Sequence, residues 1–352
     1  ALSNRLDYFR RELKVENLCI SGGFALNVVV NGHMLTKFPG GVYVPSAPGD
    51  DGQCLGNVYV MLAEQKEEIE IMPTITKSSD AFLGTPNAVD PGAVAQALAD
   101  SDHKSYIVFE TTDVSDLIAQ MLASGSVVCL YQPRAEFGPR ALGARSILAD
   151  PRRADAVSRL NILKGREWFM PFAPTVLREA MSDWFVLEAD SPFMSFAVKA
   201  TPRAVRELPA IVNADKSARV QTVDSDDRSP LRGVLIRFAE HTQVPVLLNT
   251  SFNQGGEPIV ETVQQAIDSF SSMPVNALGI GRFVVIKSLS PDAGDLPIST
   301  TISHLDLEVY SKYRVASIRR VPRVAKRRQE SYDNSTAQRR DRSTVQLSSS
   351  AL

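Results

Sequence analysis

Short apolar runs alternate with amphipathic helical stretches between Asn17 and Lys287, and this alternation restricts the fold more than any other feature of the sequence. Apolar runs of about four to eight residues bounded by turn residues indicate buried strands, whereas apolar residues three and four apart mark one face of a helix. A chain that keeps switching between the two patterns is predicted to form an α/β architecture. The strongest strand pattern begins near Val244, and the run starting at Phe283 is predicted to be the last strand.

The alternating pattern divides the chain into three segments. The first, 1–75, contains a helical pattern over 3–13, a short strand pattern at 17–20 and a Gly-Gly turn that leads into a second helix. The second, 76–290, follows a polar link and is predicted to be an α/β domain with a mixed sheet. The third, 291–352, is basic and loses apolar periodicity, so we expect it to be disordered.

Composition and charge restrict the function classes. The formal net charge of -2 gives no global field that would favour a membrane or nucleic acid partner. No apolar run reaches the roughly 18 residues of a membrane span. Cys19, Cys54 and Cys129 lie in apolar surroundings without a CxxC pair, which predicts buried thiols and a cytoplasmic location. The basic residues concentrate in 312–342, so a nucleic acid contact by this tail stays open as an alternative.

Two short motifs in the first segment could face phosphates or a metal ion. Gly22 and Gly23 lack a Cβ atom, so their backbone N–H groups can approach an anion closely, and Asn27 follows at the start of the next helix. Asp50 and Asp51 lie in a tight loop ahead of a helix, where carboxylate oxygens suit hard cations. An ordinary Gly-Gly turn and an Asp N-cap are the structural alternatives.

The second segment is rich in cations and hydrogen-bond donors. The run EFGPRALGARS holds Arg140 and Arg145 in a Gly/Pro-shaped turn, an arrangement that suits bidentate binding of phosphate or carboxylate, with surface ion pairing as the alternative. Further candidates for an anion site are Lys164, Arg166, Arg219, Asn249, Ser251 and Asn253. The four histidines are isolated and form no HxxxH pair. These residues indicate positioning of a phosphorylated or carbonyl-bearing anion rather than nucleophilic catalysis.

Taken together and in order, the motifs resemble the O-carbamoyltransferases of antibiotic biosynthesis and nodulation-factor decoration. The matching runs are SGGFALN, PGDDGQCLGN, AFLGTPN, RAEFGPRALGARSILADPR, LNILKGREWFMPFAP, SPFMSF, ARVQTV, VLLNTSFNQGGEPIV and LGIGRFVVIK. They cover roughly residues 15–287, and the basic tail lies outside them. The resemblance is to the carboxy-terminal portion of that family, with its amino-terminal metal-binding half absent.

The resemblance implies a fold and an activity. The first segment is similar to part of an actin-like ATPase-type transfer domain, and the second resembles threonylcarbamoyl-AMP synthase. Such proteins form carbamoyl-adenylate from carbamoyl phosphate and ATP, and pass the carbamoyl group to a hydroxyl of a natural product or sugar. The implied cofactors are ATP, Mg²⁺ and a divalent transfer-site metal of the Fe²⁺ type. The implied partners are these small molecules, together with a separate amino-terminal half or a second copy of the chain, and neither a membrane nor nucleic acid.

The resemblance also implies roles for individual residues. Arg140, Lys164 and Arg219 are implied to act on carbamoyl phosphate or the adenylate, assisted by Arg145, Arg166, Asn249, Ser251 and Asn253. Gly22, Gly23 and Asn27 are implied to face nucleotide phosphates, and Asp50 falls where the fold supplies a metal ligand.

The chain departs from the family pattern at several positions. The family has a His-x-Asp-Gly-Thr run where this chain has residues 213–217, an Arg where it has Met170 and a Gly where it has Pro133. Two alternatives therefore stay open beside the enzyme: a truncated or degenerate relative that binds a nucleotide or partner without catalysis, and a relative of the tRNA threonylcarbamoyl transferases.

Overall fold

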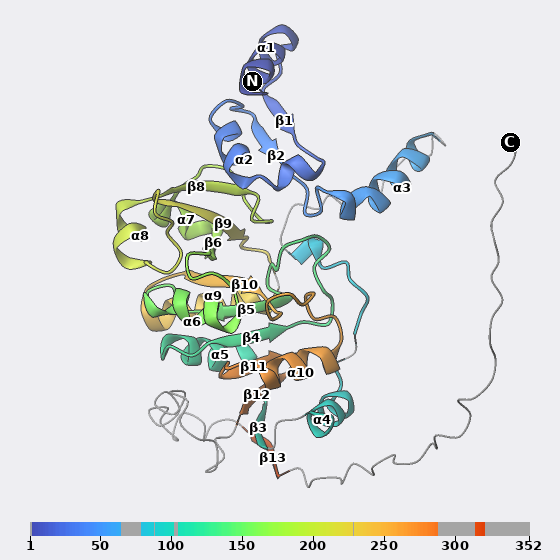
Figure 1. Ribbon diagram of the computed structural model, residues 1–352, viewed down its shortest axis with the longest axis vertical. Helices are drawn as coiled ribbons and strands as arrows, with labels where there is room; N and C mark the ends of the chain where they lie inside the picture. Colours follow the sequence, from blue (N-terminus) through green and yellow to red (C-terminus); the bar gives the residue numbers. More distant parts are fainter. Residues whose placement is uncertain are drawn as a thin grey trace, which may run out of the picture. The chain divides into compact units, whose positions relative to one another are not determined.

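A mixed β-sheet of 11 strands forms the centre of the part of the chain that is described (Figure 1). The structure is a computed structural model and describes residues 2–64, 79–87, 89–101, 105–227, 229–287 and 314–320. The strands are β3 (Ser105–Glu110), β4 (Val128–Tyr131), β5 (Arg145–Ala149), β6 (Ala173–Leu177), β7 (Phe185–Val186), β8 (Phe196–Ala200), β9 (Ser217–Val223), β10 (Val246–Ser251), β11 (Ala277–Ile280), β12 (Phe283–Lys287) and β13 (Arg314–Arg320). Their order is β13-β3-β12-β11-β4-β5-β10-β6-β9-β8-β7. The pairs β4–β11 and β6–β9 are parallel, which confirms the predicted α/β class and mixed sheet.

Several helices begin at residues that cap them. Asp90 accepts the N–H of Ala93 at 2.8 Å and Pro91 opens α4, whereas Thr262 and Gln265 form a capping box at the start of α10. The helices are α1 (Leu2–Leu13), α2 (Val28–Leu35), α3 (Gln53–Glu64), α4 (Pro91–Asp100), α5 (Val114–Ala123), α6 (Asp155–Leu163), α7 (Met181–Trp184), α8 (Pro202–Glu207), α9 (Pro230–Thr242) and α10 (Val263–Ser272). Helix α5 packs against α9, and α10 packs against α4. No helix among the described residues is long and apolar enough to cross a membrane.

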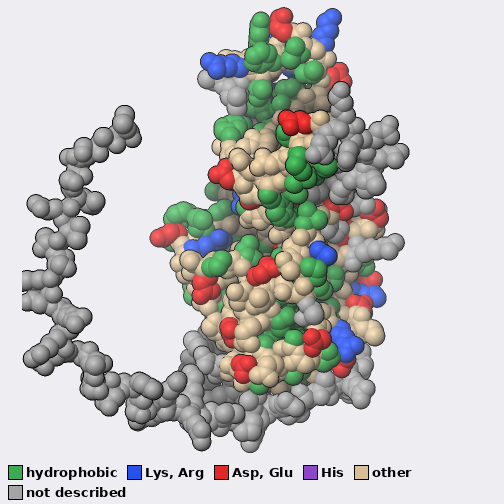
Figure 2. All heavy atoms as spheres, turned by 90° about the vertical axis from the view of Figure 1, so that its right-hand side faces the viewer, with side chains coloured by type: hydrophobic (Ala, Val, Ile, Leu, Met, Phe, Trp, Pro, Cys, Tyr) green, Lys and Arg blue, Asp and Glu red, His purple; other side chains and the backbone are tan. Residues whose placement is uncertain are grey.

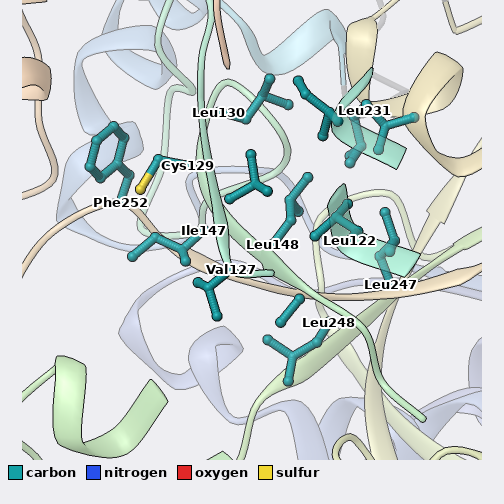
Figure 3. Close-up of a cluster of buried hydrophobic side chains, with 14 of the residues drawn as sticks. Leu122, Val127, Cys129, Leu130, Ile147, Leu148, Leu231, Leu247, Leu248 and Phe252 are labelled. Atoms are coloured by element: carbon teal, nitrogen blue, oxygen red, sulfur yellow. The ribbon is translucent and has the colours of Figure 1, made fainter. Parts of the chain in front are cut away.

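The main hydrophobic core lies on the central strands β4, β5 and β10. Cys129, Ile147 and Leu248 come from these three strands, and each is 0% exposed (Figure 3). The thiol of Cys129 is buried as predicted, and this burial raises its pKa. Every residue of β4 and β5 is buried, so both faces of these two strands are covered.

The first segment contributes a small parallel pair, β1 (Asn17–Cys19) and β2 (Gly41–Tyr43), and the helix α2, which packs against β8. The buried amide of Asn31 on α2 donates to the carbonyl oxygens of Ala25 at 2.6 Å and Ser195 at 3.0 Å. Gly32 permits this close approach, because a Cβ atom there would lie 2.0 Å from the carbonyl oxygen of Ala197. The first segment is therefore packed closely against the large sheet at β8, next to the edge strand β7.

We expect Gly32→Ala to lower the free energy of unfolding by about 1–3 kcal/mol, because the added methyl group must push α2 away from β8. Urea denaturation followed by circular dichroism measures the change. Gly23→Ala is the matched control, since a Cβ atom at Gly23 meets nothing within 4 Å. Equal stability of the two variants would show that α2 does not rest on β8 as described.

The first segment also exposes large apolar side chains. On α1, Tyr8 is 55% and Phe9 53% exposed; on α3, which has no buried residue, Val60 and Met61 are 58% and 52% exposed. Figure 2 shows hydrophobic side chains on the surface around the amino-terminal elements. Cys19 and Cys54 are exposed too, so the prediction of buried thiols was wrong for these two, which lie on β1 and α3.

Several boundaries differ from the sequence-based expectations. The strand at Phe283 is not the last one, because β13 pairs antiparallel with β3 at the edge of the sheet. That strand lies inside the predicted disordered tail, whose remaining residues, 288–313 and 321–352, are outside the described residues. The division at residue 75 falls within 65–78, which is likewise outside them, and residues 1–320 form one compact unit.

Candidate functional site

A cavity of about 420 Å³ lies where β9 begins and β10 ends, beside the Gly/Pro turn of 136–145. The loop 166–172 supplies another wall, and Val28 and Val29 at the start of α2 contribute from the first segment. Residues from stretches that are far apart in the sequence therefore meet at one cavity. We call it the arginine cavity, because Arg140, Arg166 and Arg219 all line it.

One carboxylate shapes the turn that carries Arg140. The Oε1 atom of Glu136 accepts the backbone N–H groups of Leu142 and Ala144, both at 2.7 Å, and of Arg145 at 3.1 Å. Gly138 and Gly143 adopt φ values of +129° and +119°, which L side chains rarely reach. The turn thereby wraps around the Glu136 carboxylate, and Arg140 is held at the wall of the cavity. Sequence reasoning missed this role of Glu136, although its position ahead of two glycines was visible.

The three arginines of the cavity form a concentrated positive site. Burial lowers the pKa of Arg140 and of Arg166. Burial also lowers the pKa of Arg219 to about 10, with further lowering by the charges of Arg140 and Arg166. Within the described residues no acidic side chain forms an ion pair with any of the three. Like charges held together without a counter-ion favour a bound anion, and guanidinium groups suit phosphate in particular.

Two contacts hold the side chain of Arg166 in place at the cavity wall. Its Nε donates to Asn161 Oδ1 at 2.7 Å, and its guanidinium lies 4.1 Å from the ring centroid of Phe172. These contacts fix the plane of the guanidinium group against an aromatic wall. Arg166 therefore stands where the sequence placed it, among the residues that can bind an anion.

The side chain of Lys164 is buried against the 251–253 loop and does not line the arginine cavity. It is 4% exposed, and its Nζ donates to Ser251 O at 2.6 Å, Ser251 Oγ at 3.1 Å, Asn253 O at 3.2 Å and Asn253 Oδ1 at 2.8 Å. Lys164 and Asn253 are not among the residues that line the arginine cavity, whereas Ser251 is. The ammonium group therefore holds the 251–253 loop in place, and its effect on a bound anion passes through that loop.

Arg145, which was also predicted to bind substrate, likewise is not among the residues that line the cavity. It is 0% exposed; its guanidinium donates to Val260 O at 3.0 Å and Glu261 O at 3.1 Å, and also to Gln132 O. The aromatic ring of Tyr131 lies 3.7 Å from its Cζ atom. The guanidinium donors are thus directed at backbone carbonyl groups, so Arg145 joins the motif to the 260–261 segment.

We expect anion binding to depend on pH through Lys164, because its ammonium group holds the 251–253 loop beside the cavity. Burial, with the nearby charge of Arg166, lowers the pKa of Lys164 to about 8. Above that pH the neutral amine keeps two donors for four acceptors, so we expect affinity for sulfate, whose charge is constant, to fall several-fold between pH 7 and 9. Isothermal titration calorimetry measures it, and Lys164→Met should bind weakly without this pH dependence. An unchanged profile in Lys164→Met would contradict the role.

The lowered pKa of Lys164 also makes the stability of the fold depend on pH. The folded pKa of about 8 lies below the unfolded value of about 10.4, so the unfolded state binds more protons between these two pH values. The contribution of Lys164 to the free energy of unfolding therefore increases as pH rises through this window, while anion binding weakens.

The motifs of the first segment surround a second cavity of about 870 Å³. Gly22 and Asp50 line it, and the N–H of Gly22 donates to Pro48 O at 2.6 Å. Asn27 caps α2 by accepting the N–H of Val30 at 3.2 Å, and neither Asn27 nor Gly23 is among the lining residues. No group of three or more His, Cys, Asp or Glu that could hold a metal ion occurs in the described ranges, so Asp50 belongs to no such group there.

Two family descriptions match the sequence. Residues 119–287 match the Carbamoyltransferase C-terminus, and residues 2–58 match the Carbamoyltransferase N-terminus. The arginine cavity is lined by residues from both matched regions.

Curated relatives are similar over most of this chain. The uncharacterized protein sll1178 of Synechocystis sp. is 34% identical over 303 residues, which cover 80% of this chain and 49% of that protein. The nodulation protein NolO of Bradyrhizobium diazoefficiens is 36% identical over 289 residues, covering 80% of this chain and 51% of NolO. The chain spans about half the length of the curated relatives it matches.

Among solved structures, HypF of T. kodakarensis is similar with a TM-score of 0.34 and 15% identity, over 47% of this chain and 21% of HypF. Sua5 of P. abyssi is similar with a TM-score of 0.34 and 12% identity, over 47% of this chain and 46% of Sua5. Similarity at this level does not permit transfer of residue roles. The two family matches, which together include more than half of the chain, and the similarity to NolO support one conclusion: the chain belongs to the carbamoyltransferase family.

Proposed function

We propose that this chain is the carboxy-terminal part of an O-carbamoyltransferase. Its arginine cavity would form carbamoyl-adenylate from carbamoyl phosphate and ATP, and the carbamoyl group would then pass to a hydroxyl of a natural product or sugar. Family membership and the nodulation relatives support the transferase class. The curated relatives are about twice as long as this chain. The identity of the acceptor and the residues that complete the transfer site are therefore also part of the proposal.

The observation that carries the proposal is the convergence of Arg140, Arg166 and Arg219 on one cavity without acidic partners in the described residues. Carbamoyl phosphate is a small dianion, and its reactions place negative charge on leaving phosphate oxygens. Fixed guanidinium groups in a partly buried site stabilise such charge with little reorganisation. A cavity of about 420 Å³ also leaves room for the nucleotide beside the acyl phosphate.

The proposed reaction consists of a hydrolysis and an adenylyl transfer, and it needs no oxidant or reductant. Water cleaves carbamoyl phosphate to carbamate and inorganic phosphate. A carbamate oxygen then attacks the α-phosphorus of ATP, and pyrophosphate leaves. The arginines would hold the two phosphate groups in turn and neutralise the charge on the departing oxygens. Mg²⁺ bound to ATP would supply additional charge.

The transfer step needs more than the described residues provide. A divalent metal of the Fe²⁺ type was expected from the family, but within the described ranges Asp50 belongs to no group of three or more His, Cys, Asp or Glu that could hold it. The exposed apolar side chains of α1 and α3 support association with a separate amino-terminal half or with a second copy of the chain. A cytoplasmic location, where ATP and carbamoyl phosphate are available, is part of the same proposal.

The proposal is tested by mixing the purified chain with carbamoyl phosphate, ATP and Mg²⁺ and measuring pyrophosphate. We expect release of pyrophosphate that requires carbamoyl phosphate and the protein. Binding of ATP without any pyrophosphate would instead support the non-catalytic nucleotide-binding alternative. Failure to bind either substrate would overturn the proposal.

A further inference from the structure

The buried side chain of Asn249 has an unusual hydrogen-bond pattern. Asn249 lies on β10, lines the arginine cavity and is 1% exposed. Its Nδ2 donates to Gln221 Oε1 at 2.9 Å and to the carbonyl oxygen of Ala141 at 3.3 Å. Its Oδ1 is buried and has no hydrogen-bond partner, and it is the one such side-chain atom among the residues lining this cavity.

The neighbours of Asn249 determine which way its amide group faces. Gln221 donates its own Nε2 to the carbonyl oxygen of Leu142 at 2.8 Å, so it presents Oε1 to Asn249. If the oxygen and nitrogen of Asn249 exchanged places, its oxygen would oppose two other oxygens, those of Gln221 and Ala141. The network therefore holds Oδ1 as an acceptor without a donor.

A buried acceptor without a partner is costly, and a ligand can remove that cost. The guanidinium groups of the cavity cannot be the whole recognition element, since they attract any small anion of suitable size. A ligand that satisfies the site completely carries a phosphate for the arginines and an N–H donor for Asn249. An acyl phosphate with an amide nitrogen has both groups within one small molecule.

We propose that Asn249 Oδ1 accepts an N–H of the carbamoyl group and thereby selects a carbamoyl donor over an acyl phosphate of the same shape and charge. This inference rests on the proposed function and adds the residue that determines donor specificity. Gln221 acts as a positioning residue, because it touches Asn249 and fixes the orientation of its amide. Replacing the carbamoyl NH₂ by a methyl group leaves Oδ1 buried and unpaired, which disfavours binding.

The direct test compares carbamoyl phosphate with acetyl phosphate on the unmodified chain by isothermal titration calorimetry. The two ligands differ in an NH₂ group against a CH₃ group, and we expect carbamoyl phosphate to bind at least ~10-fold more tightly. Equal affinities would overturn the inference and leave the proposed function standing. Binding of neither ligand would overturn the proposed function, and the inference with it.

A variant then assigns the preference to one residue. In Asn249→Ala the affinity for carbamoyl phosphate should fall to that for acetyl phosphate, while the affinity for inorganic phosphate stays within about twofold, because the arginines are unchanged. Retention of the preference in Asn249→Ala would overturn the inference. Should this variant not fold, the comparison on the unmodified chain decides the matter alone, since it needs no substitution.

Discussion

Replacement of Arg219 by alanine is expected to lower carbamoyl phosphate-dependent pyrophosphate release by about 10²–10³-fold, the loss that follows removal of one essential charge-stabilising donor. Arg219 projects from β9 into the arginine cavity, and its pKa of about 10 reflects burial beside two like charges. An anion therefore gains more from Arg219 than from a solvent-exposed arginine. The measurement is the initial rate of pyrophosphate release at saturating ATP.

Two further variants make the test specific. Arg219→Lys keeps the positive charge but loses the planar fork, so we expect intermediate activity. Arg206→Ala removes an exposed arginine on α8 that pairs with Glu207 at 2.8 Å, and it should leave the rate unchanged. Unchanged turnover in Arg219→Ala would refute the assignment of the cavity. Equal losses in Arg206→Ala would indicate a general effect of charge.

The second large expected effect is on stability, and it distinguishes Arg145 from Arg140 in the run EFGPRALGARS. We expect Arg145→Met to lower the free energy of unfolding by about 3–5 kcal/mol, because the buried carbonyl groups that accept from its guanidinium lose their donors. Val260 and Glu261 supply two of these acceptors, and the ring of Tyr131 loses its cation as well. Urea denaturation at equilibrium measures this change.

Arg140→Met is the matched variant, since it makes the same substitution five residues earlier. Its guanidinium lines the cavity and has no ion-pair partner among the described residues, so its removal should leave stability within about 1 kcal/mol. Binding of carbamoyl phosphate should fall sharply instead. Loss of stability in Arg140→Met, with little in Arg145→Met, would reverse the assigned roles.

The strands of the core could be predicted because their patterns are local. β10 and β12 are short apolar runs bounded by turn residues, and both form where the sequence placed them. β13 was missed because its sequence, RVASIRR, is basic and its pairing with β3 is a long-range contact. Local pattern cannot reveal which distant strand offers a free edge.

The sequence offered candidate residues for the cavity by type and spacing alone. The structure places Arg140, Arg219 and Asn249 in its wall, whereas Arg145 and Lys164 hold the surrounding backbone. Residue type and spacing indicate a cationic site, but they cannot tell which cation faces the ligand. That outcome depends on how Glu136 closes the turn and on the positive φ values within it. The contribution of Val28 and Val29 likewise depends on the packing of α2 against β8.

The most direct test of the account is detection of carbamoyl-adenylate itself. Protein, ¹³C-labelled carbamoyl phosphate, ATP and Mg²⁺ are mixed, quenched and analysed by mass spectrometry. We expect a labelled carbamoyl-adenylate to form together with an equal amount of pyrophosphate, and to be lost in Arg219→Ala. Formation of ADP without labelled adenylate, or the same yield of adenylate in Arg219→Ala, would show that the arginine cavity does not form the adenylate.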